Sequence, residues 1–224
     1  ILTKFNNDYQ FVARYTEDIK LTNERIGSVD SSNPTDPTDP TDPTDPTTPE
    51  QPGANAVALF PSFDFSNFPA FLASLNNFGL QPYANQGVGT GINGGNSLHI
   101  ESAGPAGNHY VFTTLYSNAL PTNATKISFF VKGTTASKSL SLNVYKQDGS
   151  FAAYNVGDLT TNKLLTVAEN NQYAGVINTN NQWVLVTLDV SSLPLANTAG
   201  ANSFALKVGS ASAYDLHVTN FVIE

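Results

Sequence analysis

Most of the chain, from about residue 54 onward, alternates apolar and polar side chains. The clearest example is 139–145, where Leu140, Leu142 and Val144 are separated by polar or mixed side chains. A period of two is typical of a β-strand that buries one face. Related patterns occupy residues 98–102, 110–116, 127–132, 184–189, 204–208 and 217–223. Clusters of Gly, Asn, Pro and Ser separate these segments, so the pattern predicts an all-β sandwich, with helical signal only at 67–75.

The first thirty residues predict a β-hairpin. Residues 1–5 form one apolar segment, Asn6-Asn7-Asp8 supplies a turn, and Tyr9, Phe11, Ala13 and Tyr15 alternate with other side chains. A hairpin by itself is only marginally stable in water. We therefore interpret residues 1–30 as the terminal hairpin of an upstream domain, and the chain as a fragment of a longer precursor.

Residues 31–53 predict a polyproline-type linker. The triplet Pro-Thr-Asp repeats through Asp36, Asp39, Asp42 and Asp45, and a period of three matches the three residues per turn of polyproline II. Fixed proline dihedrals and repulsion between carboxylates both extend the chain, so at about 3.1 Å per residue it would hold its flanks some 60 Å apart. The predicted organisation is therefore a hairpin at 1–30, a linker at 31–53 and a β-sandwich at 54–224.

Charge separates these parts and excludes some partners. The formal net charge is −8, with four basic against ten acidic residues up to Gln51 and six lysines against eight acidic residues beyond it. The second part contains no Arg, whereas phosphate recognition relies on clustered Arg and Lys. Nucleic acid is therefore not an expected partner of the sandwich. No apolar run approaches the roughly 20 residues that span a bilayer, so we expect no membrane insertion of this fragment.

The sequence offers few groups for catalysis. It has no Cys, which excludes disulfides and thiol nucleophiles, and it contains neither a G-x-S-x-G elbow, an HExxH motif nor a Walker loop. Asp148 precedes Gly149 in the order expected of a hairpin turn, and Asp189 has no visible partner carboxylate. We therefore predict that the fragment is not an enzyme.

Four short motifs occur in the order found in jelly-roll carbohydrate-binding modules of bacterial secreted and surface proteins. They are Phe63-Asp64-Phe65-Ser66-Asn67, residues 94–100 (GGNSLHI), residues 183–191 (WVLVTLDVS) and residues 219–224 (TNFVIE). Over about 160 residues the chain resembles this family, in which "FExG", "GxxSLxI", "Wxxvxxdvs" and "xxDNFxIE" recur. The resemblance implies a jelly-roll, galactose-binding-like sandwich that binds carbohydrate, with Trp183 packed in the core.

Many such modules hold a structural calcium ion between the first and last strands. On that basis Asp64, Glu101 and Asp215 are the candidate metal ligands here. Asn220 stands where these modules usually place an aspartate, which departs from the family pattern. The alternative is that all three acids are solvated edge residues.

Tyrosine and amide side chains are the candidate ligand-binding groups. Sugar recognition uses flat apolar surfaces together with hydrogen-bonding amides, and the predicted sandwich is rich in both. We select Tyr145 with Asn143 on the polar face of its strand, and Tyr83, Tyr154 and Tyr173 in loop-like surroundings. Each tyrosine has an alternative role as a cap on the core with its hydroxyl at the surface.

A second resemblance concerns the N-terminus. Residues 1–21 (ILTKFNNDYQFVARYTEDIKL) resemble the closing strands of OB-like domains in bacterial secreted nucleases and surface lipoproteins. This resemblance implies an OB-like barrel upstream and carries no nuclease activity over to the fragment.

The sequence therefore predicts a non-catalytic, extracellular or outer-surface bacterial module that binds a neutral glycan. One alternative is a structural domain that docks to proteins of a bacterial cell-surface, outer-membrane assembly. A further alternative is an accessory domain of a secreted nuclease. Calcium is the one cofactor that the residues suggest.

Overall fold

In the computed structural model, residues 2–5, 8–11, 53–117, 120–121 and 123–224 are described. The chain divides into two units, Ile1–Pro46 and Thr47–Glu224. In the first unit, β1 (Leu2–Phe5) and β2 (Asp8–Phe11) form an antiparallel pair in which Leu2 is opposite Phe11. This pairing agrees with the predicted hairpin, whereas residues 12–52, which include nearly all of the predicted linker, lie outside the described residues.

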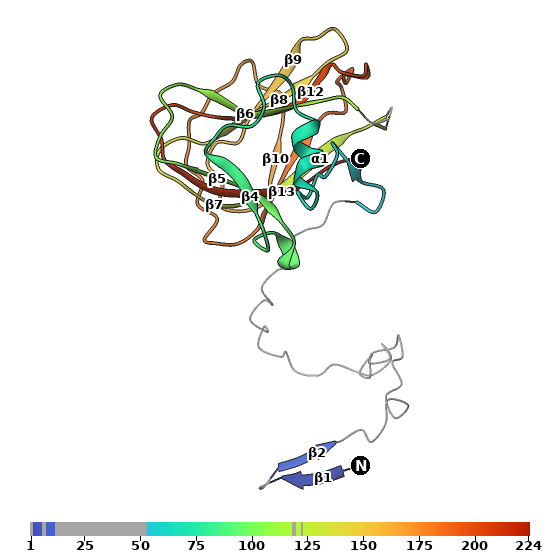
Figure 1. Cartoon of the computed structure of the whole chain (residues 1–224), viewed down its shortest axis with the longest axis vertical. Coiled ribbons are helices and arrows are strands. Elements are labelled where there is room, and N and C mark those ends of the chain that lie inside the picture. The colour runs from blue at the N-terminus through green and yellow to red at the C-terminus, as the bar shows by residue number, and fades with distance from the viewer. Residues whose placement is uncertain (1, 6–7, 12–52, 118–119, 122) are drawn as a thin grey trace, which may run out of the picture. The chain divides into compact units, whose positions relative to one another are not determined.

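The second unit contains two β-sheets. The larger sheet has seven strands in the order β10-β11-β7-β13-β5-β4, with β3 paired to β13, and the smaller has the order β6-β12-β8-β9. Its strands are β3 (Val57–Ala58), β4 (Ala84–Gly87), β5 (Ser97–Ser102), β7 (Lys126–Thr135), β10 (Lys163–Leu165), β11 (Val184–Asp189) and β13 (Tyr214–Ile223). The smaller sheet comprises β6 (His109–Leu115), β8 (Leu140–Tyr145), β9 (Phe151–Asn155) and β12 (Asn202–Val208). Figure 1 shows the two sheets as two layers. Because many strands that pair within a sheet are far apart in sequence, the fold is a jelly-roll-like sandwich, as predicted.

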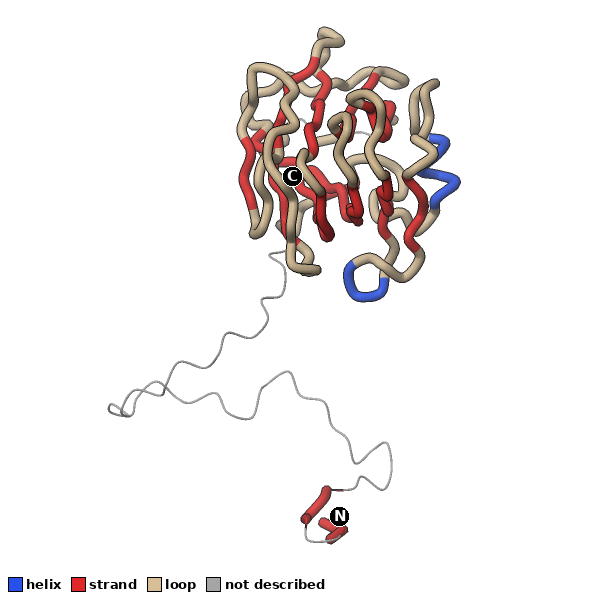
Figure 2. Tube along the Cα trace, turned by 90° about the vertical axis from the view of Figure 1, so that its left-hand side faces the viewer, coloured by secondary structure: helices blue, strands red, loops and turns tan. Residues whose placement is uncertain are grey.

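All seven predicted strands are present, and four short strands are additional. The pattern missed β3, β4, β9 and β10 because β3 and β10 have only two and three residues, while β4 (ANQG) and β9 (FAAYN) lack strong alternation. In Figure 2 the helical residues among the described part of this unit form two short segments, α1 (Phe68–Ala73) and η2 (Ile92–Gly94). Neither described helix has the length and apolarity needed to cross a bilayer.

The space between the sheets is filled by apolar side chains centred on Phe221. Its ring stacks on Phe129 of β7 with centroids 4.7 Å apart, and it also contacts Phe112 and Phe204 of the smaller sheet. All four phenylalanines are fully buried. This aromatic cluster joins the two layers, since burial of large aromatic side chains dominates core energetics.

A β-bulge turns Phe221 into the core. The pairing of β13 with β7 shifts register between Thr219 and Val222, and Asn220 has φ of 55°. Asn tolerates this left-handed conformation better than most residues. The bulge explains why Val218 and Phe221 both face the core although they are three positions apart on the strand. Asn220 therefore has a conformational role at the position where the resembling family places an aspartate.

The helix α1 closes one end of the sandwich. Asn67 caps it by accepting a hydrogen bond from the Ala70 amide at 3.2 Å, Pro69 lies in its first turn, and Phe71 is buried in the core. This agrees with the helical signal at residues 67–75 and with the preference of Asn for N-cap positions and Pro for the first turn.

Candidate functional site

A groove lies over one end of the outer face of the smaller sheet. It has a volume of about 420 Å³ and combines three aromatic side chains with uncharged amides and one histidine. The residues that line it are Asn76, Phe78, Gly79, Gln81, Asn108, His109, Tyr110, Thr113, Tyr145 and Asn202. No Asp, Glu, Lys or Arg is among them, so the chemistry of this lining is compatible with a neutral, amphipathic ligand.

Phe78 projects into solvent at the rim of this groove. It lies in a tight turn closed by a 2.9 Å hydrogen bond from the Gly79 amide to the Asn76 carbonyl, with Gly79 at φ of 62°. The Asn76 side chain also accepts a bond from the Phe78 amide at 3.1 Å. Phe78 is 87% exposed, the highest exposure among the large apolar side chains of the described chain. A rigid turn that holds a phenyl ring in water provides a ready surface for stacking.

Tyr110 forms the floor of the groove because of a second bulge. The register between β12 and β6 shifts between Leu206 and Lys207, so Phe112 pairs with Leu206 on the core side while Tyr110 pairs with Lys207 on the outer side. The Lys207 ammonium lies 4.3 Å from the centroid of the Tyr110 ring. The Tyr110 hydroxyl accepts a hydrogen bond from Asn143 at 3.3 Å. Both contacts fix the orientation of this ring.

Tyr145 lies beside Tyr110 on the same face. It is half-buried, and its ring meets Phe151 edge-on at 5.9 Å. Burial, followed by the neighbouring Tyr110, raises the pKa of Tyr145 to about 12. The hydroxyl therefore stays protonated at neutral pH and can both donate and accept hydrogen bonds.

A second hollow of about 380 Å³ adjoins the groove. It is bounded by the turn at residues 146–149 and by residues 196–198 and 201, and it shares Tyr145 and Asn202 with the first hollow. The two hollows therefore meet at these shared residues. This arrangement can accommodate an elongated ligand, with Tyr145 near its middle.

Two predicted ligand residues support the groove from behind. Tyr83 lies against His109, with rings nearly parallel at 6.2 Å and a 3.5 Å contact between its hydroxyl and His109 Nδ1. Asn143 is fully buried, because Asn171 covers it and donates a 2.7 Å bond to its carbonyl oxygen. Of the five predicted residues, Tyr145 alone lines the groove, while Tyr83 and Asn143 each contact a lining residue.

The structure places Tyr154 and Tyr173 away from the groove; it corrects the expected loop position of Tyr154, whereas Tyr173 does lie in a loop. Tyr154 lies in β9, faces the core with no exposed surface, and donates a 2.6 Å bond to the Asp189 carbonyl. Tyr173 is 9% exposed and packs against Gly209. Neither ring is free to stack on a ligand. A groove made of Tyr145, Tyr154 and Tyr173 together is therefore not formed.

Sequence reasoning missed most of the residues that line the groove. Phe78 carried a readable signal, since an aromatic between Asn77 and Gly79 in a turn has no core to enter. Tyr110 carried none, because regular alternation would place it on the same face as Phe112. Trp183 also differs from expectation: it is half-buried and lies 5.0 Å from the Lys132 ammonium instead of in the core.

The predicted calcium ligands do not converge. Glu101 and Asp215 are directly opposite each other on β5 and β13. Asp64 instead lies near the far end of β13, because the carbonyl of its neighbour Phe63 accepts a hydrogen bond from the Phe221 amide. Phe221 is six residues, or about 20 Å, along the strand from Asp215. The Asp64 carboxylate accepts hydrogen bonds from the Ser66 amide and hydroxyl at 3.1 and 2.7 Å, which are local turn contacts.

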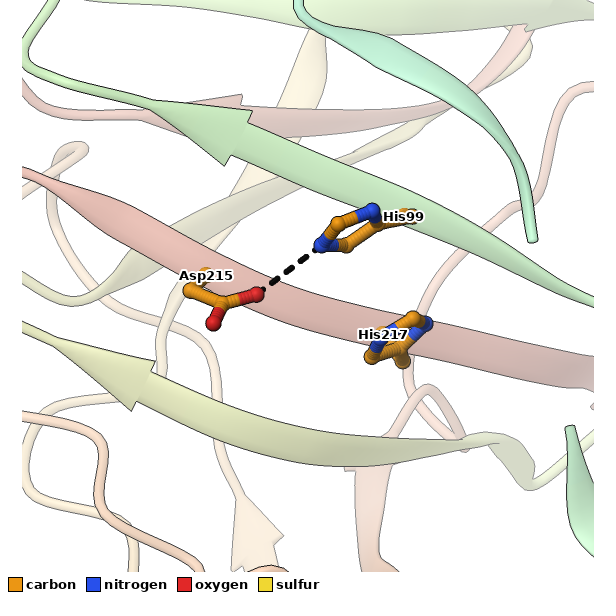
Figure 3. A group of neighbouring side chains, drawn as sticks. All are labelled: His99, Asp215 and His217. Atoms are coloured by element: carbon orange, nitrogen blue, oxygen red, sulfur yellow. Dashed lines mark hydrogen bonds and ion pairs between the residues drawn. The ribbon is translucent and has the colours of Figure 1, made fainter. Parts of the chain in front are cut away.

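A different set of side chains gathers around Asp215, on the outer face of the larger sheet. Among the described residues, one group of three potential metal ligands has its ligand atoms within 4.8 Å of one another. It consists of His99 of β5 together with Asp215 and His217 of β13. Figure 3 shows His99 directed to Asp215, and the His99 Nε2 to Asp215 Oδ1 distance is 2.9 Å. The two imidazoles stack with centroids 4.3 Å apart. Burial, then His99 and Lys132, lowers the pKa of His217 to about 4.

The remaining carboxylates considered for catalysis have local structural roles. Asp148 accepts bonds from the Ser150 amide and hydroxyl at 2.9 and 2.6 Å, and Asp189 does the same with Ser191 at 3.0 and 2.6 Å. These bonds lower the pKa of both carboxyl groups. A low pKa suits a turn cap and does not suit a general acid.

Comparison with known proteins identifies no relative. The chain matches no model of a known protein family, and no curated protein matches its sequence.

Proposed function

We propose that the sandwich is a non-catalytic binding module for a neutral glycan, and that the groove around Phe78, Tyr110 and Tyr145 is its binding site. The observation that carries this proposal is the exposed Phe78 ring at the rim of a groove whose lining residues include several amides and no Asp, Glu, Lys or Arg. A pyranose ring has an apolar face and an equatorial belt of hydroxyls. Phe78 and the tyrosines suit the face, and the amides suit the hydroxyls.

The amide side chains are positioned by the fold before any ligand arrives. The Asn76 amide donates a 3.4 Å bond to Asn202 across the groove, and the backbone amides of Asn76 and Gln81 are fixed by bonds to β6. Prepositioned groups lose little entropy on binding, which favours affinity. The adjoining hollow beyond Tyr145 supports an oligosaccharide in preference to a single sugar.

The wider setting is also part of the proposal. A module of this kind, joined to a Thr-Asp-Pro linker, suits a larger bacterial protein that is secreted or displayed on the cell surface. There the linker would give the module reach toward a polysaccharide. The rival function, docking to a cell-surface protein, predicts no glycan affinity and is one outcome of the experiment below.

The decisive experiment is a binding screen of the complete 224-residue chain against neutral plant, algal and host polysaccharides, followed by calorimetry on any hit. The expected result is saturable binding that Phe78→Ala weakens by about tenfold, or ~1.4 kcal/mol. Leu164→Ala is the matched control, because Leu164 is 63% exposed on β10 of the larger sheet and lies outside the groove. This control should bind as the unmodified chain does.

Two outcomes would contradict the proposal. Absence of binding across the panel would favour the protein-docking function. Binding that Phe78→Ala and Tyr145→Ala leave unchanged, while both variants remain folded by circular dichroism, would place any glycan site elsewhere on the molecule.

A further inference from the structure

On the larger sheet, strand pairing assembles two imidazoles and two carboxylates on one outer face. His99 pairs with His217, and Glu101 pairs with Asp215, across the antiparallel strands β5 and β13. Residues two apart on a strand share a face, so all four side chains project from the same side of the sheet. This surface belongs to the sheet that does not form the glycan groove.

The ligand atoms of His99, Asp215 and His217 lie close enough together to meet at one metal ion after a small adjustment. Ligand atoms around a tetrahedral ion with bonds of about 2.1 Å lie about 3.4 Å apart. His99 Nε2 and Asp215 Oδ1 are 2.9 Å apart, and the nitrogen of His217 completes a set within 4.8 Å. A modest rotation of the stacked imidazoles would direct both nitrogens at one ion. Such an ion would take the place of the proton now shared between His99 and Asp215.

A chain of hydrogen bonds sets the tautomer of His217. The Thr90 hydroxyl donates to the Gly87 carbonyl at 2.9 Å, so it must accept from the Ser97 hydroxyl, which lies 2.7 Å away. Ser97 has then used its only proton and must accept from His217 Nδ1 at 2.9 Å. The proton of His217 is thereby fixed on Nδ1, and Nε2 keeps its lone pair. Outer hydrogen bonds of this kind are what orient histidine ligands at metal sites.

A neighbouring positive charge acts on the site, since Lys132 contributes to the lowered pKa of His217. Lys132 is the cross-strand neighbour of His217 on β7. Its ammonium lies 5.0 Å from the centre of the Trp183 ring, just before β11. His99 is 28% exposed and Asp215 is 70% exposed, so an ion can reach the site from solvent.

We infer that His99, His217 and Asp215 form a binding site for a divalent transition-metal ion of the zinc class, with Glu101 opposite Asp215 on the neighbouring strand. Two imidazoles with a carboxylate prefer Zn²⁺, Ni²⁺ or Cu²⁺ over Ca²⁺, which takes six or more oxygen ligands. The ion would join β5 to β13. Positions not filled by protein would remain open to water or to an external group.

The test is calorimetric titration of the complete 224-residue chain with zinc salt and, separately, with calcium salt. We expect one strong Zn²⁺ site and no comparable Ca²⁺ site. His99→Ala and His217→Ala should each lower Zn²⁺ affinity by more than about 100-fold, since even loss of an outer hydrogen-bond partner costs about 10–100-fold. His109→Ala is the matched control, because this third histidine lies in the smaller sheet, and it should bind Zn²⁺ normally.

A second measurement needs no substitution and so does not depend on how a variant folds. In long-range ¹H–¹⁵N spectra of the imidazoles, Zn²⁺ should shift the nitrogen signals of His99 and His217 and leave those of His109 unchanged. His217 should show the Nδ1–H tautomer before metal is added. Zinc binding that survives loss of both histidines, or that leaves both imidazole spectra unchanged, would overturn the inference.

Discussion

The ammonium of Lys207 lies 4.3 Å above the ring of Tyr110 and, on its other side, donates a 2.7 Å hydrogen bond to the side-chain oxygen of Asn171. Asn171 in turn donates to Ser141 and Asn143 at 2.7 Å each. Lys207 is only 8% exposed. This one buried cation therefore joins the floor of the groove to the loop that covers the rest of the sheet.

Replacing Lys207 with Met should lower the free energy of unfolding by about 1–2 kcal/mol. A hydrogen bond to a charged group contributes about 1.5–3 kcal/mol, and removing a buried charge offsets part of that loss. Urea denaturation measures the change. Lys126→Met is the control, because Lys126 is 54% exposed and its Glu224 contact is a surface ion pair of 3.9 Å; a shift of equal size there would contradict the explanation.

Tyr154→Phe should separate structure from binding. The Tyr154 hydroxyl in β9 bonds to the Asp189 carbonyl in β11 and so connects the two sheets. Its removal deletes a part-buried hydrogen bond, which costs about 0.5–1.5 kcal/mol of unfolding free energy. Glycan affinity, measured by calorimetry, should not change. Weaker glycan binding by a folded Tyr154→Phe protein would instead indicate that Tyr154 contributes to the binding site.

Gly133→Ala should destabilise the larger sheet strongly. Gly133 has φ of 126°, and an added Cβ would lie 2.1 Å from the Asp215 carbonyl oxygen. Backbone strain of this kind costs about 1–3 kcal/mol, and the steric clash adds to it. Gly149→Ala isolates the strain, because Gly149 has φ of 79° and nothing lies within 4 Å of its added Cβ. The thermal unfolding midpoint should fall further for Gly133→Ala, and equal midpoints would exclude a role for the clash.

The sandwich should lose stability at alkaline pH. Burial raises the pKa of both Tyr83 and Tyr145 from 10 to about 12, so the folded chain holds these protons more tightly than the unfolded chain does. Their stabilising contribution is complete below pH 10 and is lost as the pH rises toward 12. Urea denaturation at increasing pH, combined with phenolate absorbance, measures both effects. A Tyr83→Phe/Tyr145→Phe protein with the same loss of stability between pH 10 and 12 would refute this origin.

The strands of the sandwich could be predicted because their signal is local. In β8, alternating Leu140, Leu142 and Val144 identify the core face, and Asn143 and Tyr145 do lie on the outer face. What covers that face could not be read from the strand. Asn143 is buried because Asn171, distant in sequence, folds over it, whereas Tyr145 remains beside a hollow.

The groove and the histidine site depend on features with no local signature. The bulge at the start of β6 sends Tyr110 outward, against the alternation that would pair it with Phe112 in the core. His99 and Asp215 bond across 116 residues of sequence. Their contact requires β5 to pair with β13 in one particular register.

The sequence by itself therefore determined the class of fold, since a period of two in apolar side chains states which face of each strand is buried. It also determined the inventory of neutral aromatic and amide groups that line the groove. Only the tertiary structure decided which of those groups meet. Strand order, register and bulges are set by packing between segments far apart in the chain, and a one-residue change in register exchanges the two faces of a strand.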